Sequence, residues 1–247
     1  MTASLIISTY NRSDALEVCL RSVAALRELP LEVIVGDDGS SDDTRDVVTA
    51  LQRDFPVPLI YVEQPDEGFR LAMIRNKCVA RASGEYIIQI DGDIFLHPDF
   101  VADHLREARP GHFLKGGRVQ LDEATSVEIC DDRRPRPIRF LSKGIEAKRP
   151  NTLRLPLIAD MLAPRYRQHR QNVLGCNMSF YRDDFIRANG YDESFEGWGG
   201  EDLDLALRFR NMGLGKRYLK FCALAYHLWH REASKERSRH NHDLAHA

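Results

Sequence analysis

The chain has 247 residues and a formal net charge of −2 at pH 7. This length suits one large α/β domain with a substantial buried core, and the nearly balanced charge argues against a general nucleic-acid-binding protein. Five scattered cysteines with no CxxC pair indicate reduced thiols. The sequence shows neither a signal-peptide pattern nor an apolar run of membrane-spanning length, so we expect a cytoplasmic protein.

Short apolar runs alternate with amphipathic helical segments through the first 110 residues. The predicted strands and helices, in alternation from the first strand, are residues 5–7, 16–26, 32–36, 47–55, 59–62, 71–78, 85–90 and 101–105. The strand and helix pair repeats about every 25–30 residues, which is typical of βαβ units and a parallel sheet. We therefore predict an α/β fold with a Rossmann-like, mostly parallel central sheet flanked by helices.

The pattern is less regular after Pro110. The later predicted strands are residues 113–114, 119–121, 173–180, 217–221 and 226–230, and the later helices are residues 184–189 and 203–210. Residues 131–171 form a basic insertion rich in proline and arginine. It is either a solvated loop with short helices, or a surface for an anionic acceptor or for peripheral contact with the inner face of a membrane. Residues 231–247 are expected to be a disordered polar tail.

Acidic side chains follow two of the predicted strands at the point where each strand ends. Asp91 and Asp93, separated by Gly92, follow the central strand, and Asp38 follows the second strand. Because ligands bind at the carboxyl ends of strands in open α/β sheets, we expect these acids and Thr9 to share one edge. Two carboxylates there predict a cation site that bridges nucleotide phosphates, although Asp-Gly is also a common turn pair.

The segment at residues 197–202 reads Gly-Trp-Gly-Gly-Glu-Asp. Its glycines permit close approach and unusual backbone angles, and Glu201 and Asp202 fall in the first turn of a predicted helix. The helix dipole alone explains acids at this place but not the glycines before them. We therefore predict a functional loop in which Trp198 packs against a sugar ring and ionised Asp202 accepts a proton.

Two further pairs of residues are candidates for the same site. His227 and His230 lie three residues apart near the end of a strand and are candidate ligands that complete the metal shell. A carboxylate combined with imidazole favours Mn²⁺, with Mg²⁺ as the alternative, because Mg²⁺ prefers oxygen ligands. Arg70 and Arg75 lie on one predicted helix, where they either face a diphosphate or carboxylate or belong to an ordinary helix surface.

The ordered set of motifs resembles the family 2 glycosyltransferases of the GT-A fold. The matching segments are residues 7–12, 35–40, 68–76 and 91–93. Residues 175–180 and 198–202 are similar to the C-terminal part of the β-1,4-galactosyltransferases and the bacterial chondroitin polymerases. The resemblance implies a nucleotide-sugar-binding half at residues 1–110 and an acceptor-binding and catalytic half at residues 111–230 of one domain.

The resemblance also implies roles for individual residues. Asp202 is the catalytic base and Glu201 helps to shape the sugar pocket beside it. The metal ligands are Asp93 with His227 or His230. The residues implied in binding the UDP-sugar are Thr9, Tyr10, Arg12, Asp38, Arg70, Arg75, Asp91 and Gly92. Those implied in binding the acceptor are Asn177, Trp198, Gly199 and Gly200.

The implied reaction is an inverting transfer of a hexose or N-acetylhexosamine from a UDP-sugar to a glycan hydroxyl, which gives a β-linkage. The implied acceptor is a bacterial surface polysaccharide or lipopolysaccharide. A nucleotidyltransferase is an alternative, but residues 5–13 contain neither the glycine nor the lysine that its phosphate loop requires. The other alternative is a nucleotide-sugar-binding module without catalytic activity, which has no need of a base beside the acceptor.

Overall fold

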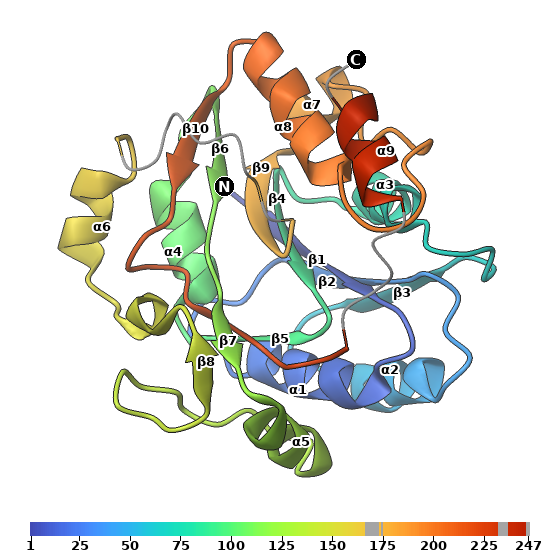
Figure 1. Cartoon of the computed structure of the whole chain (residues 1–247), viewed down its shortest axis with the longest axis vertical. Helices are drawn as coiled ribbons and strands as arrows, with labels where there is room; N and C mark the ends of the chain where they lie inside the picture. Colours follow the sequence, from blue (N-terminus) through green and yellow to red (C-terminus); the bar gives the residue numbers. More distant parts are fainter. Residues whose placement is uncertain (166–172, 174, 232–236, 246–247) are drawn as a thin grey trace.

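The computed structural model describes residues 1–165, 173, 175–231 and 237–245, and Figure 1 shows its two sheets and surrounding helices. The larger sheet has the strand order β10-β6-β9-β4-β1-β2-β3. Its strands are β1 (Ala3–Thr9), β2 (Glu32–Asp37), β3 (Leu59–Glu63), β4 (Tyr86–Asp91), β6 (His112–Lys115), β9 (Asn177–Tyr181) and β10 (Gly215–Tyr218). Every neighbouring pair is parallel except the two that involve β9. The predicted mostly parallel sheet is confirmed.

Helices cover both faces of this sheet because its central strands are apolar on both sides. Leu5 and Ile7 of β1 belong to a core with α1 (Ser13–Ala24), α2 (Thr44–Gln52) and α4 (Phe100–Glu107). Ile6 points the other way, into a second core with α3 (Leu71–Arg81), α7 (Arg182–Arg187) and α8 (Glu201–Asn211). This alternation is the period of two expected of a strand that is buried on both faces.

A second, smaller sheet lies beside the first and was not predicted. Its order is β5-β11-β7-β8, formed by β5 (Ile94–Leu96), β11 (Ala225–His227), β7 (Val119–Leu121) and β8 (Ile145–Ala147). In the antiparallel pairing of β11 with β5, His227 stands opposite Ile94. This register brings the C-terminal histidines next to Asp93, which immediately precedes β5.

The structure contains two regular elements that were not predicted, helix α5 (Glu123–Asp131) and strand β8. The basic insertion also contains the 3₁₀ helix η1 (Arg149–Thr152) and α6 (Pro156–Leu162), which fit its interpretation as a loop with short helices. Residues 166–171 of that insertion, with Arg167 and Arg170, lie outside the described residues, as does Leu174 of the predicted strand 173–180.

The tail expected to be disordered contains α9 (Ser238–Leu244), which packs against the start of α8 at Gly200. Asn241 of this helix is only 1% exposed, and a side chain buried so deeply requires an ordered surrounding. The prediction for residues 231–247 is therefore wrong at 237–245, while residues 232–236 and 246–247 lie outside the described residues. None of the described helices combines the length and apolar character needed to cross a bilayer.

Candidate active site

The carboxyl ends of β1, β2 and β4 lie side by side at one edge of the large sheet. Ser8 pairs with Asp91 and Thr9 pairs with Asp37 in the parallel ladders, so the acids that follow these strands are brought together. Gly92 packs against β1, since a side chain there would meet the Ser8 carbonyl oxygen at 3.1 Å and the Thr9 side chain at 3.2 Å. A glycine is therefore needed to bring the turn after β4 so close to Thr9.

Asp93, His227 and His230 converge on one point. The Asp93 Oδ2 atom lies 3.3 Å from His227 Nε2 and 3.0 Å from His230 Nε2. The Asp93 Oδ1 atom is buried and has no hydrogen-bond partner among the described residues. Burial by itself would raise the pKa of Asp93, but the two imidazoles hold it well below its usual range, so the carboxyl group is ionised.

This arrangement fits a divalent cation. One ligand atom from each of the three side chains can be chosen so that all lie within 4.8 Å of one another. A buried carboxylate oxygen without a partner costs free energy unless a ligand satisfies it. One oxygen and two imidazole nitrogens form a donor set that suits Mn²⁺ better than Mg²⁺.

Arg75 of α3 is the central cation of the site. Its side chain is 1% exposed, and it donates hydrogen bonds of 2.9 Å to both Asp91 and Asp202. A third carboxylate, that of Glu201, lies 3.4 Å away. Burial opposes the charge of the guanidinium, but Asp202 and Asp91 raise the pKa of Arg75 far enough to keep it protonated. Arg75 was predicted to face a diphosphate or carboxylate or to belong to an ordinary helix surface, and the structure places it inside the protein against carboxyl groups.

Asp202, in the first turn of α8, is held by three donors. Its Oδ1 atom accepts from Arg75 and, at 3.0 Å, from the Tyr191 hydroxyl, while Oδ2 accepts from the Gly175 amide at 2.8 Å. A side chain at Gly175 would collide with this carboxylate. Gln89 of β4 in turn donates from Nε2 to the Tyr191 hydroxyl at 2.9 Å and so fixes it. The orientation of Asp202 is therefore set by the core of the protein, and its side chain remains 18% exposed.

Glu201 differs from its neighbour because it is almost completely buried. Loss of hydration raises the pKa of Glu201 to about 8, with the charge of Asp202 as the next cause. The carboxyl group is therefore largely protonated at neutral pH. It can donate a hydrogen bond in that state, which an ionised carboxylate cannot do.

The glycine-rich loop before α8 is fixed from behind by the C-terminal helix. Gly197, Gly199 and Gly200 all have positive φ, and Trp198 between them is 43% exposed. Asn241 of α9 donates from Nδ2 to the Glu196 carbonyl at 3.0 Å, and its backbone oxygen would lie 2.8 Å from a side chain at position 200. A glycine at position 200 therefore lets α9 pack directly on the start of α8.

A cavity of about 410 Å³ opens at the ends of β2 and β3. Its walls include Asp37, Gly39, Ser40, Glu63, Gln64, Pro65 and Asp66. Asp38 lies behind this wall, where Gln64 Nε2 and, at 2.8 Å, the Arg70 amide donate to it. Burial raises the pKa of Asp38. Thr9 Oγ1 and Gln64 Oε1 are buried without a hydrogen-bond partner among the described residues, so both can take a bond from a ligand.

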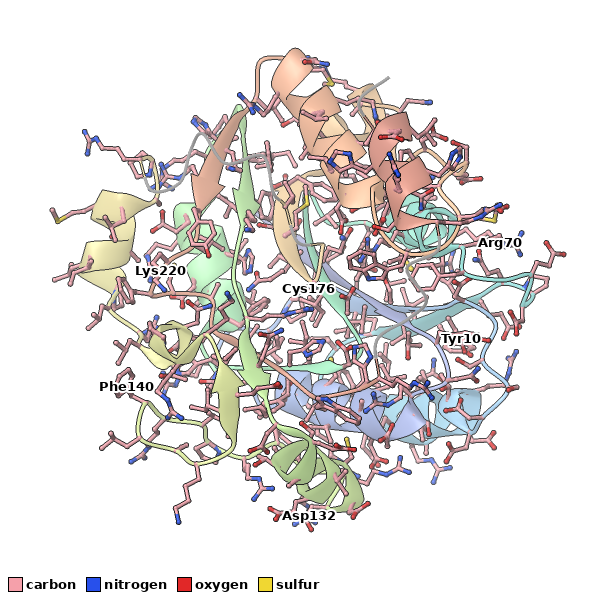
Figure 2. The ribbon with its side chains drawn as sticks, viewed as in Figure 1. Tyr10, Arg70, Asp132, Phe140, Cys176 and Lys220 are labelled. Carbon is pink, nitrogen blue, oxygen red and sulfur yellow. The ribbon has the colours of Figure 1, made fainter. Side chains whose placement is uncertain are left out.

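The remaining predicted donor-site residues lie around this cavity and the acids. Tyr10 is exposed and donates from its hydroxyl to Asp66 at 3.1 Å. Arg70 immediately precedes α3 and pairs with Glu67 at 2.7 Å, and both Tyr10 and Arg70 lie on the right of the molecule in Figure 2. Arg12 pairs with Asp14 at 3.1 Å near the start of α1.

Asn177 was predicted to bind the acceptor, and the structure corrects this. Its side chain is fully buried and donates from Nδ2 to the carbonyls of Gly117 and Ala223 at 2.8 and 3.1 Å. His104 Nε2 lies 3.1 Å from its Oδ1 atom. Asn177 therefore ties β9 to the loops at residues 117 and 223, and it has no free polar atom to offer to an acceptor.

Arg118 is a candidate that sequence reasoning missed. Burial alone would lower its pKa, but Cys176, Asp91 and Asp93 raise it, so this guanidinium stays charged close to both acids. Cys176 lies near the middle of the molecule in Figure 2. The Gly-Gly pair before Arg118 was the available signal, because glycines after a strand allow close approach of other groups, which here are the side chains of Asn177 and Asn151.

Two segments of the chain match models of known protein families. Residues 4–157 match the model of glycosyl transferase family 2, and residues 155–231 match the family described as the N-terminal domain of galactosyltransferase. These two matches confirm the resemblance found in the motifs, including the C-terminal part.

Two curated relatives show the extent of the similarity. Validoxylamine A glucosyltransferase of Streptomyces hygroscopicus subsp. limoneus is 32% identical over 85% of this chain and 48% of its own length. Chondroitin synthase of Pasteurella multocida (strain Pm70) is 26% identical over 91% of this chain and 24% of its own length. The chain thus spans about half the length of the first of these relatives and a smaller part of the second.

Two solved structures share the fold. The mannosyltransferase PcManGT of Pyrobaculum calidifontis, in complex with GDP-Man and Mn²⁺, superposes with a TM-score of 0.64 at 20% identity, over 93% of this chain and 57% of that one. Residues 1–349 of TarS from S. aureus, in complex with UDP-GlcNAc, give a TM-score of 0.62 at 17% identity, over 94% of this chain and 60% of that one. The predicted GT-A fold is confirmed.

Proposed function

The chain belongs to glycosyl transferase family 2, and we propose that it transfers a hexose or N-acetylhexosamine from a UDP-sugar to a hydroxyl group of a glycan acceptor. The observation that carries this proposal is that Asp91 and Asp93, which lie two residues apart at the end of β4, each belong to a different cluster of functional side chains. Asp93 meets two imidazoles, while Asp91 shares the Arg75 guanidinium with Asp202. A cation site and a candidate base thus stand on either side of the turn after β4.

The nucleoside part of the donor is assigned to the cavity at the ends of β2 and β3. Its volume of about 410 Å³ is within the range of small-ligand sites, roughly 300–1,000 Å³. The unpartnered Thr9 Oγ1 and Gln64 Oε1 atoms offer hydrogen-bonding groups to a base or ribose. Asp38 accepts from Gln64 of the cavity wall and from the Arg70 amide, and it keeps further lone pairs for the ligand.

The diphosphate is assigned to the cation site and Arg118. Asp93, His227 and His230 would hold Mn²⁺, with Mg²⁺ as the alternative, and such an ion supplies positive charge that stabilises a departing diphosphate. The Arg118 guanidinium, whose charged form Asp91 and Asp93 favour, would add a second cation for the same oxygens. The solved relative with GDP-Man and Mn²⁺ supports a nucleotide-sugar and divalent-cation site in this fold.

Asp202 is assigned as the general base. Arg75 and Tyr191 bind its Oδ1 atom and Gly175 binds Oδ2, so Oδ2 retains a lone pair for the acceptor hydroxyl. The acceptor oxygen forms a bond to the anomeric carbon while the bond from that carbon to the diphosphate breaks, and the hydroxyl proton passes to Asp202. A single displacement inverts the anomeric centre and gives a β-linkage.

The acceptor is assigned to the loop that carries Trp198. The exposed indole offers a flat apolar face to a sugar ring, and Gly199 and Gly200 leave space beside it. Protonated Glu201 stands at the start of α8 behind this loop. The similarity to chondroitin synthase favours a polysaccharide acceptor, such as a bacterial surface glycan or lipopolysaccharide.

Hydrolysis of a panel of nucleotide sugars without acceptor tests the proposal. We expect slow, Mn²⁺-dependent release of UDP from one UDP-hexose or UDP-N-acetylhexosamine, with GDP-mannose as the comparison donor. Calorimetric binding of UDP without hydrolysis or transfer of any sugar would instead favour a binding module. Release from GDP-mannose alone would contradict the assignment of uracil to the cavity.

A further inference from the structure

Helix α6 has its large apolar side chains on the outside. Ala159 and Ala163, one turn apart, are fully buried, whereas Leu157 is 82% exposed and Met161 is 72% exposed. Ile158 is exposed as well. A helix on the surface of a globular protein normally turns its apolar stripe toward the core. The exposure of large apolar side chains on the outward face of α6 therefore requires another explanation.

A second apolar group projects from the loop before β8. Leu141 is 89% exposed and Phe140 beside it is also exposed. Arg149 of η1 donates to the carbonyls of Phe140 and Ser142 at 2.7 and 2.8 Å, so it fixes the loop against the element that leads into α6. Phe140 lies on the left edge of the molecule in Figure 2, the edge along which α6 lies in Figure 1.

The same segment carries a strong local charge. Residues 133–165 contain nine arginines and lysines and two acidic residues, a formal net charge of +7 in a chain whose total is −2. Arg133, Arg136 and Arg154 pair with carboxylates of other elements. Among residues 133–165, all of which the structure describes, the exposed cationic side chains without a carboxylate at ion-pair distance are Arg134, Arg139, Lys143, Lys148 and Arg165.

We propose that this basic apolar face, formed by residues 139–143 and the outward side of α6, binds the surface of an anionic lipid bilayer. Leu141, Leu157 and Met161 enter the boundary between headgroups and acyl chains, and the cations around them meet lipid phosphates. The combination of exposed large apolar side chains with basic neighbours is the pattern of an interfacial membrane contact. No turnover is involved, so this surface is independent of the proposed transferase reaction.

The charge distribution argues against a second copy of the chain as the occupant. A two-fold symmetric contact places the same patch on both sides, and this would bring the unpaired cations of one copy against those of the other. Like charges facing each other across an interface are unfavourable. An anionic leaflet supplies the opposite charge over the whole patch.

Co-sedimentation of the full chain with vesicles tests the proposal. We expect binding to vesicles in which about a third of the lipid is phosphatidylglycerol, weaker binding to pure phosphatidylcholine, and release at about 1 M salt, where the Debye length is about 3 Å. The triple variant Leu141→Ser/Leu157→Ser/Met161→Ser should lose at least about tenfold in vesicle affinity. Lys143→Gln and Lys148→Gln should each lose about fivefold.

A matched control is Leu31→Ser/Val127→Ser/Ile186→Ser, which removes three exposed apolar side chains from other elements and should leave vesicle binding unchanged. Both triple variants should keep the wild-type thermal unfolding curve and donor hydrolysis in solution. A second measurement uses Leu157→Cys with an environment-sensitive fluorophore, whose emission should shift to the blue with phosphatidylglycerol vesicles.

Three results overturn the proposal. The first is unchanged vesicle binding by the serine triple variant of the proposed face. The second is a fluorophore-labelled Leu157→Cys variant whose emission does not respond to anionic vesicles. The third is a dimer in light scattering that the serine triple variant dissociates, because a second copy would then cover the face.

Discussion

Arg75 donates to Asp202 from one terminal nitrogen and to Asp91 from the other, each at 2.9 Å. The two acids come from opposite halves of the chain, one at the end of β4 and the other in the first turn of α8. A single buried guanidinium therefore links the strand end assigned to the donor with the carboxylate assigned as the base.

Arg75→Met should strongly destabilise the fold. The substitution preserves most of the volume but leaves Asp91 and Asp202 without their shared cation, and breaking a buried ion pair from one side costs about 3–5 kcal/mol. Urea unfolding followed by circular dichroism measures the loss. Arg81→Met on the exposed end of the same helix should change the free energy of unfolding by less than about 0.5 kcal/mol. Equal stability of the two variants would contradict the role of Arg75.

Asp202→Asn should retain donor binding and lose most turnover. A positioned general base contributes about 10²- to 10⁴-fold, and an amide at this position cannot take the acceptor proton. Steady-state kinetics gives kcat, and calorimetry with UDP gives the dissociation constant. Asp204→Asn, two residues further along α8, removes a carboxylate that pairs with Arg208 and should keep normal kcat. Near-normal turnover by the Asp202 variant would exclude this residue as the base.

Asp93→Asn, His227→Ala and His230→Ala should each weaken Mn²⁺ binding by at least about tenfold, since even residues that only support metal ligands contribute about 10- to 100-fold. Titration calorimetry with Mn²⁺ measures this without any substrate. His240→Ala on the exposed side of α9 is the matched control and should bind the ion normally. A chelator should abolish donor hydrolysis, and unchanged hydrolysis in chelator would contradict the metal assignment.

Asn241→Ala should loosen the Trp198 loop. The variant removes the donor to the Glu196 carbonyl and leaves that oxygen without its bond, at a cost of about 1–3 kcal/mol. We expect faster proteolysis within residues 196–200 and a higher KM for the acceptor, with unchanged UDP binding. Arg239→Ala, exposed on the same helix, should behave as wild type. A wild-type cleavage rate in the Asn241 variant would show that α9 does not hold the loop.

Glu201→Gln should change how stability depends on pH. The pKa of about 8 in the folded protein lies above the ordinary value of 4.5, so the folded state binds the extra proton between these values. The stability linked to this proton is fully present below about pH 4.5 and is lost as the pH rises through 8, by at most about 1.4 kcal/mol per pH unit. The variant has no such proton, so its stability relative to wild type should increase between about pH 5 and 8 in urea unfolding. A constant difference over this range would exclude an elevated pKa.

The sequence by itself determined the sheet and the strand ends that carry the site. Apolar runs that alternate with amphipathic helices allow little besides a parallel α/β sheet, and in such a sheet Thr9, Asp38 and Asp91 must share one edge. The glycines around Trp198 marked the loop before α8 for a similar local reason. Each of these features depends on residues close together in the chain.

Only the tertiary structure decided which distant side chains meet. The pairing of β11 with β5 brings His227 and His230 to Asp93, and the inward face of α3 buries Arg75 between acids of both halves. Asn177 and Asn241 likewise bond to backbone atoms far away in the sequence, one inside the core and the other behind the Trp198 loop. Periodicity indicates that a residue is buried but not what it contacts, because contacts depend on the packing of elements that the local sequence does not describe.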